Sequence, residues 1–111
     1  MRSVIGRFLE HSRLFAFDAA ERSTLFMGSA DLMPRNLDHR VEVVTPVEDL
    51  GLQAELSATF EGLWRDTAAS FELDAGGSWN RVQAKKDERP RSGQQTLMRR
   101  ARRRISLARA R

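Results

Sequence analysis

Apolar and polar positions alternate in short runs along the first third of the chain. Residues 3–10 place four apolar side chains at helical spacing, which predicts a short amphipathic helix or turn. Residues 12–18 carry apolar side chains on both faces, as a central strand does, and residues 24–30 have the same character. The polar residues 20–23 separate the two runs, so we expect these runs to pair as a hairpin.

The middle of the chain predicts a turn, a strand and a long helix. Residues 31–38 are expected to be irregular, because Pro34 disfavours helical geometry at the residue before it and the segment is rich in turn formers. Residues 40–47 have the composition of a third strand. Asp49 is suited to cap a helix over residues 50–71, whose apolar stripe needs a sheet to cover it.

The last third of the chain changes character. Residues 78–83 predict a short strand, residues 84–93 contain no core-forming side chains, and residues 94–111 are helical by propensity and rich in arginine. We therefore expect an α+β fold, with a small mixed β-sheet and packed helices in one domain over residues 1–83. A linker at 84–93 and a basic Arg-rich helical tail at 94–111 complete the predicted organisation.

The charge is unevenly distributed. The net charge of +4 combines a balance of −6 over residues 1–80 with one of +10 over residues 81–111. The basic character therefore belongs to the tail and not to the predicted domain. The chain has no cysteine, which excludes disulfides and cysteine-based zinc sites. Residues 1–9 are too short and polar for a signal peptide, and no apolar run reaches membrane-spanning length, so we expect a cytoplasmic protein.

The residues best suited to binding or catalysis lie in the first third of the chain. His11 and Arg13 are two positions apart, so a strand would project their side chains from the same face. Arg35 and Asn36 come after the second predicted strand. Guanidinium groups bind phosphate oxygens through two hydrogen bonds, and an imidazole can act as nucleophile or proton donor near neutral pH. These residues therefore suit a phosphoryl group.

The spacing of these residues resembles that of the phospholipase D superfamily. HSRLFAFD fits HxKxxxxD with arginine in place of lysine, and GSADLMPRN is similar to GSxNxxxR. The second pattern puts Asp31 at its asparagine position and Arg35 at its arginine position. Strict alternation along a strand would place Asp18 opposite His11, so we expect a structural role for Asp18.

A narrower resemblance covers residues 2–47. RSVIGRFLEHSR followed by GSADLMPRNLDHRVEVVTPV resembles the last domain of bacterial polyphosphate kinases, which has a phospholipase-D-like fold. The resemblance implies an enzyme that reversibly transfers the terminal phosphate of ATP to inorganic polyphosphate, yielding ADP, with Mg²⁺ bound outside this chain. It also implies a fragment whose partners are the remaining domains of the kinase, in a homo-oligomeric full-length enzyme.

Within that resemblance, His11 matches the second active-site histidine. The phosphorylated histidine of the family lies in the preceding domain, so we expect the isolated chain to be inactive. We expect His11 to be catalytic and to contact ATP or phosphate together with Arg13, Arg35 and Asn36, with no metal ligand in this chain. Alternatively, Arg13 could pair with a carboxylate such as Glu42, and Arg35 could cap the turn through backbone carbonyls.

Two other functions compete with this interpretation. The arginine-rich tail could belong to a small protein that binds RNA or another polyanion, although we expect nucleic acid not to be the partner. The single HxK-like motif could instead be half of a phospholipase-D-type phosphodiesterase, which would have to dimerise to complete its site.

Overall fold

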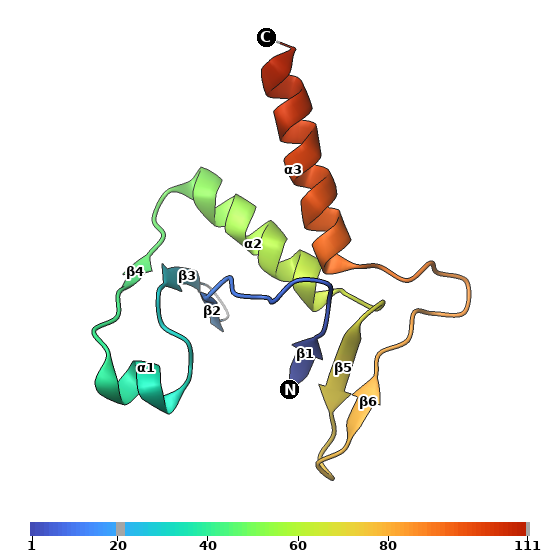
Figure 1. Ribbon diagram of the computed structural model, residues 1–111, viewed down its shortest axis with the longest axis horizontal. Helices are drawn as coiled ribbons and strands as arrows, with labels where there is room; N and C mark the ends of the chain where they lie inside the picture. The colour runs from blue at the N-terminus through green and yellow to red at the C-terminus, as the bar shows by residue number, and fades with distance from the viewer. Residues whose placement is uncertain (20–21, 111) are drawn as a thin grey trace. The chain divides into compact units, whose positions relative to one another are not determined.

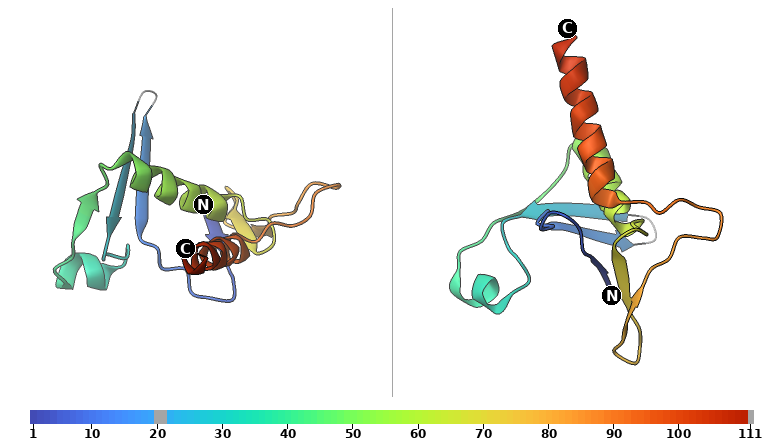
Figure 2. Two further views of the ribbon diagram at one scale, coloured as in Figure 1. Left: turned by 90° about the horizontal axis from the view of Figure 1, so that it is seen from above. Right: turned by 45° about the vertical axis from the view of Figure 1, so that its right-hand side comes forward.

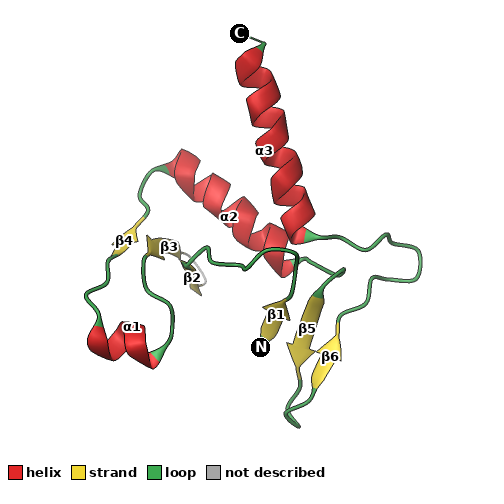
Figure 3. Ribbon diagram, viewed as in Figure 1, coloured by secondary structure: helices red, strands yellow, loops and turns green. Residues whose placement is uncertain are grey.

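The computed structural model describes residues 1–19 and 22–110, and Figures 1 and 3 label its elements. The chain divides into two compact units, one of His11–Ala58 and the other of Met1–Glu10 with Thr59–Arg111. Each unit contains one sheet of three antiparallel strands, so the described residues form two sheets where the sequence suggested one mixed sheet. In chain order the elements are β1 (Arg2–Val4), β2 (Leu14–Ala19), β3 (Arg22–Gly28), α1 (Pro34–His39), β4 (Val44–Pro46), α2 (Leu50–Trp64), β5 (Ser70–Leu73), β6 (Trp79–Arg81) and α3 (Gly93–Arg109).

The unit of His11–Ala58 is built on the β2–β3 hairpin. Its two strands run side by side in Figure 2, in a register that pairs Phe15 with Phe26, which confirms the predicted hairpin. Residues 20–21 of the predicted connector lie outside the described residues. Phe26 also meets Phe17 edge to face, with ring centroids 5.9 Å apart, and Leu25 of β3 is buried. The Phe17–Phe26 contact therefore adds a cross-strand side-chain interaction to the backbone pairing of this sheet.

The third strand is shorter than the sequence predicts. Strand β4 pairs with β3 over three residues only, where residues 40–47 were expected to be extended. At the end of the pairing the backbone N–H of Ser29 still donates to the carbonyl of Val43 at 2.9 Å, but the backbone N–H of Val43 donates to the hydroxyl of Ser29 at 3.1 Å. A side chain thus replaces a backbone partner at this end of the sheet.

The segment predicted to be irregular contains helix α1. Met33 is extended, with φ −124° and ψ 144°, as expected for a residue before proline. The prediction was wrong about the residues from Pro34 onward, because a proline at the first helical position lacks only an N–H that would have no partner there, and its φ is already set. The carbonyl of Met33 accepts the N–H groups of Asn36 and Leu37, which closes the first turn.

In the unit of Met1–Glu10 and Thr59–Arg111, the first strand of the chain pairs with β5. Strand β1 pairs with β5 from Arg2 opposite Glu72 to Val4 opposite Ser70, and β5 pairs with β6. The short amphipathic helix or turn predicted over residues 3–10 does not form as a helix, because Ser3 and Val4 belong to β1 and long-range pairing overrides the local apolar spacing.

Helix α2 begins as predicted and ends earlier. Asp49 caps it, since its Oδ1 accepts the N–H of Leu52 at 2.8 Å, but the helix ends at Trp64 and not at residue 71. The buried carboxylate of Asp66 accepts the backbone N–H groups of Ala68 and Ala69 at 2.9 and 2.7 Å. These bonds turn the chain and direct it into β5.

Helix α3 is anchored at its N-terminus. Ser92 caps it by accepting the N–H of Gln95, and the N–H of Gly93 donates to Asp66 Oδ2 at 2.7 Å. A Cβ at Gly93 would lie 2.9 Å from the carbonyl oxygen of Gly62, so only glycine allows this approach. Beyond this anchor α3 runs out as one straight helix (Figure 1). Among the described helices, none has the length and apolar character needed to span a membrane.

Candidate functional site

His11 and Arg13 lie in the segment that leads into β2. The strand begins at Leu14, so these two residues are not strand residues as the sequence suggested. Arg13 has a positive φ of 47°, which is uncommon for a residue with a side chain and breaks the alternation expected from strand geometry. The carbonyl of Arg13 still accepts the N–H of Gly28, 3.2 Å away, so the turn is tied to the end of β3.

Both side chains converge on the carboxylate of Asp31. Arg13 donates from Nε to Oδ1 at 2.9 Å and from Nη2 to Oδ2 at 3.0 Å, while His11 Nε2 lies 3.1 Å from Oδ2. The hydrogen bonds from Arg13, followed by the contact with His11, hold the pKa of Asp31 well below its usual range. The Asp31 carboxylate in turn raises the pKa of the Arg13 guanidinium. Asp31 is therefore an ionised carboxylate that fixes both groups at neutral pH.

A second carboxylate, Glu42, organises the turn after β3. Its Oε1 accepts a hydrogen bond from Asn36 Nδ2 at 2.8 Å and lies 3.2 Å from Arg40 Nε, and its Oε2 accepts the Ser29 hydroxyl. The hydrogen bonds from Ser29 and Asn36 lower the pKa of Glu42. Asn36 is 1% exposed, and its Oδ1 is buried without a hydrogen-bond partner among the described residues.

Residues 1–94 match the family described as polyphosphate kinase C-terminal domain 2. The chain belongs to this family. Its relatives include the polyphosphate kinase of Prosthecochloris aestuarii, 44% identical over 95 residues, and that of Streptomyces coelicolor, 42% identical over 104 residues. These alignments cover 86% and 94% of this chain but 13% and 14% of the relatives. The chain therefore spans about one eighth of the length of the curated relatives it matches.

A solved structure from the same family supports the fold. The crystal structure of the polyphosphate kinase from Porphyromonas gingivalis superposes with a TM-score of 0.81 and 28% sequence identity. The match covers 96% of this chain and 16% of that chain. The resemblance drawn from the sequence motifs and the predicted α+β class are both confirmed.

The four predicted site residues of this polyphosphate kinase domain have different surroundings. His11 and Arg13 meet at Asp31, whereas Asn36 is held by Glu42. In the described part of the chain, the exposed side chain of Arg35 on α1 makes no hydrogen bond or ion pair. The alternative that Arg13 pairs with a carboxylate is therefore realised, with Asp31 in place of Glu42, whereas Arg35 makes no bond to the turn within the described residues.

Sequence reasoning missed the two carboxylates that hold the site. Asp31 stood only at the asparagine position of a superfamily pattern, and Glu42 was considered only as a possible partner of Arg13. The available signal for Asp31 was its place two residues after Ser29 and four before Arg35, directly after a predicted strand, and the signal for Glu42 was only its nearness to Arg40. Within residues 1–19 and 22–110, no group of three or more metal-ligating side chains could hold a metal ion.

The side chains of His11 and Arg13 keep groups that can bind an anion. The His11 side chain is 49% exposed, so its second ring nitrogen can reach a ligand. The guanidinium of Arg13 carries more N–H groups than the two that Asp31 accepts. An ionised carboxylate only accepts hydrogen bonds, so the ring proton of His11 lies on Nε2 and Nδ1 is the nitrogen left to act.

Proposed function

We propose that this chain supplies the second phosphate-handling histidine, His11, of a polyphosphate kinase. The full enzyme would reversibly transfer the terminal phosphate of ATP to inorganic polyphosphate. The observation that carries the proposal is the half-exposed imidazole of His11, held beside Arg13 by one shared carboxylate, in a chain of this family. A phosphoryl group between these two side chains would meet a proton donor and a fixed positive charge.

Nδ1 of His11 is the atom that would act on the phosphate. With the Nε2–H bound to Asp31, Nδ1 would hold or protonate an oxygen of the transferring or leaving phosphate when the ring carries its second proton, because both ring nitrogens are donors only in the imidazolium. Arg13 would bind a second oxygen through its remaining N–H groups, and the exposed cation of Arg35 could reach the same anion. Asn36 would act indirectly, by holding Glu42 and the turn. Asp31 is a positioning residue, because it would act through His11 and Arg13.

The other components of the reaction would come from outside this chain. The acceptor histidine of the phosphoenzyme and the ligands of Mg²⁺ are expected in the remaining domains, and Mg²⁺ would supply charge neutralisation on the phosphates when bound. The partners are therefore ATP, ADP, inorganic polyphosphate and those domains, in a homo-oligomeric enzyme. The isolated chain would be inactive and would not phosphorylate itself.

The test compares two histidine variants in the full-length polyphosphate kinase that contains this segment. His11→Gln should lower kcat by about 10² to 10⁴-fold, the usual contribution of a positioned proton donor. His39→Gln is the matched control, because His39 is exposed at the end of α1. A His11→Gln enzyme with unchanged kcat would contradict the proposal.

A second measurement addresses the isolated chain. Incubation of the 111-residue chain with ATP labelled at the terminal phosphate should leave no stable phosphohistidine on it. A label that persists on this chain and disappears in His11→Gln would make His11 the nucleophile instead.

A further inference from the structure

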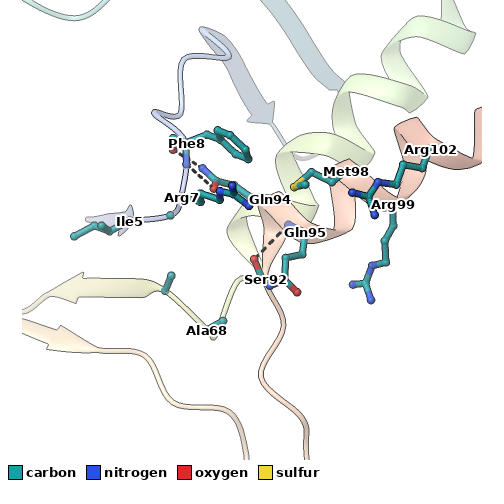
Figure 4. Close-up of a pocket in the computed structure, with 12 residues that line it drawn as sticks. Ile5, Arg7, Phe8, Ala68, Ser92, Gln94, Gln95, Met98, Arg99 and Arg102 are labelled. Atoms are coloured by element: carbon teal, nitrogen blue, oxygen red, sulfur yellow. Dashed lines mark hydrogen bonds between the residues drawn. The ribbon is translucent and has the colours of Figure 1, made fainter. Parts of the chain in front are cut away.

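A hollow of about 610 Å³ lies in the unit that contains α3, whereas His11 belongs to the other unit (Figure 4). Its wall combines the segment after β1 with one face of α3 and the turn before β5. Arg99 and Arg102 are three positions apart on α3 and so lie on the same helix face. The polar side chains of this wall are Ser92, Gln94, Gln95, Arg7, Arg99 and Arg102.

Hydrogen bonds fix the segments that form the wall of the hollow. The side-chain amide of Gln94 accepts the N–H of Phe8 at 3.1 Å and donates to the carbonyl of Phe8 at 2.5 Å. These two hydrogen bonds fix the segment after β1, which carries Arg7, against the first turn of α3. The N–H of Gly93 is bound to the buried carboxylate of Asp66, which fixes the start of the helix.

The positive charge of the wall is not balanced by acidic residues in the wall. It contains three arginines and no acidic residue, and α3 as a whole carries six arginines and no acid. Among the described residues, Arg7, Arg99 and Arg102 make no ion pair with a carboxylate. Like charges gathered in a hollow create a positive potential that attracts an anion.

The donors in the wall suit phosphate oxygens. Guanidinium groups bind such oxygens through two parallel hydrogen bonds, and the Gln95 amide offers a neutral donor beside them. Single-stranded nucleic acid is commonly bound by stacking of its bases on aromatic side chains, in addition to contacts with its phosphates. The one aromatic side chain of the wall, Phe8, has the guanidinium of Arg7 over its ring at 5.5 Å, so that face is covered.

A second hollow extends the positive surface along α3. It has a volume of about 240 Å³, is lined by Thr96, Arg99, Arg100 and Arg103, and shares Arg99 with the larger one. Two hollows joined by one arginine fit a chain of phosphates better than a single orthophosphate ion.

We propose that the hollow of Arg7, Arg99 and Arg102 binds a stretch of inorganic polyphosphate. The identity of the polyanion rests on the proposed function, whereas the anion site rests on the geometry alone. Arg99 and Arg102 lie beyond residues 1–94, the part that matches the family. The site therefore joins a segment within residues 1–94 to positions of α3 that lie beyond them.

The test measures binding of labelled inorganic polyphosphate to the full 111-residue chain by fluorescence anisotropy. Arg99→Gln with Arg102→Gln should weaken binding at least tenfold, since each charge-assisted hydrogen bond contributes about a factor of ten. The dependence on salt should also become less steep, by roughly one in the log–log slope for each lost phosphate contact. Arg7→Gln should weaken binding in the same way although it lies outside the helix.

The matched control removes two charges elsewhere on the same helix. Arg104→Gln with Arg109→Gln leaves both hollows intact, and glutamine keeps helix propensity, which circular dichroism would verify. Equal weakening by the two pairs would overturn the proposal, because it would indicate general attraction to a basic helix. Equally tight binding of single-stranded RNA through the same arginines would overturn it as well, in favour of a nucleic-acid surface.

The readout is independent of catalysis by His11. Binding by this chain requires neither ATP nor turnover, so a failure of the His11→Gln experiment in the full-length enzyme leaves the anion site untouched. Conversely, a loss of kcat in that experiment combined with unchanged polyphosphate binding in the arginine variants would overturn only the second site.

Discussion

His11 Nε2 lies 3.1 Å from Asp31 Oδ2, on a carboxylate that also holds Arg13 through two hydrogen bonds. Asp31 thus fixes the imidazole of His11 and neutralises part of the positive charge of Arg13. The contact also decides which ring nitrogen bears the proton, because an ionised carboxylate offers no donor. The orientation of the His11 ring therefore depends on Asp31.

The first prediction concerns this tautomer. In Asp31→Asn the amide can either donate or accept, so the proton of the neutral His11 ring should no longer be confined to Nε2. Nitrogen NMR of the ring at alkaline pH should give the Nε2–H form for the native chain and a mixture of tautomers for the variant. The ring of His39 should be the same in both. An unchanged His11 spectrum in Asp31→Asn would contradict the role given to Asp31.

The second prediction concerns the acidity of Asp31. Its pKa should lie well below the value of about 3.9 for an unperturbed aspartate. Arg13→Gln should raise the pKa of Asp31 toward that value, and by more than His11→Gln does, because the hydrogen bonds from Arg13 are the larger cause. Carbon NMR of the Asp31 carboxyl during an acid titration measures both shifts. The reverse order of the two variants would count against Arg13 as the main partner of this carboxylate.

The third prediction is a loss of stability in acid. The folded chain lowers the pKa of Asp31 and Glu42, and it lowers the pKa of Asp74, in the turn between β5 and β6, through hydrogen bonds from the Ser78 backbone and the Asn80 side chain. Protons therefore bind more readily to the unfolded chain. The stabilisation is present above about pH 4 and is lost as the pH falls toward the lowered values. Denaturant unfolding at several pH values should give this slope, and Asp31→Asn should flatten it.

The control for this slope is Asp18→Asn. Asp18 is an exposed carboxylate near the far end of β2, opposite Ser23. Its removal changes the net charge as much as Asp31→Asn does. If both variants flatten the slope equally, net charge and not the Asp31 contact explains the acid sensitivity.

The hairpin and the start of α2 could be predicted because their determinants are local. Alternating apolar positions fix a strand, and a capping aspartate such as Asp49 marks the first turn of a helix. The pairing of β1 with β5 joins residues far apart in the chain, as in Arg2 opposite Glu72, and no local pattern encodes it. The end of α2 was missed because it depends on the side chain of Asp66 competing for backbone N–H groups.

The candidate site was predictable in composition but not in geometry. The motifs selected His11 and Arg13, but strand alternation gave the wrong reason for their proximity. They meet because Arg13 adopts a left-handed backbone conformation before β2 and because Asp31 comes directly after β3 and its short turn. Neither feature is visible in residue periodicity, since a positive φ at an arginine is sustained by its surroundings.

The fourth prediction concerns Asp66 as the anchor of α3. Its carboxylate accepts N–H groups from Ala68, Ala69 and Gly93, and its carbonyl accepts Arg2 Nη2 at 2.8 Å. Asp66→Ala keeps the carbonyl that Arg2 uses but leaves the three backbone N–H groups without their carboxylate partner, and it should lower the free energy of unfolding by about 3 kcal/mol. Hydrogen exchange should become faster at the N–H of Gly93. Asp87→Ala, at an exposed turn position of the connecting loop, should leave both quantities unchanged.

The fifth prediction uses Gly6 and Gln94 as a coupled pair. A Cβ at Gly6 would collide with the side-chain amide of Gln94, which is held by its two bonds to Phe8. Gly6→Ala should therefore displace that amide and cost about as much as Gln94→Ala, roughly 1 kcal/mol of unfolding free energy. The double variant should cost no more than either single change, because both remove the same contact. Additive losses in denaturant unfolding would mean that Gly6 is required for its backbone and not for the room it leaves to Gln94.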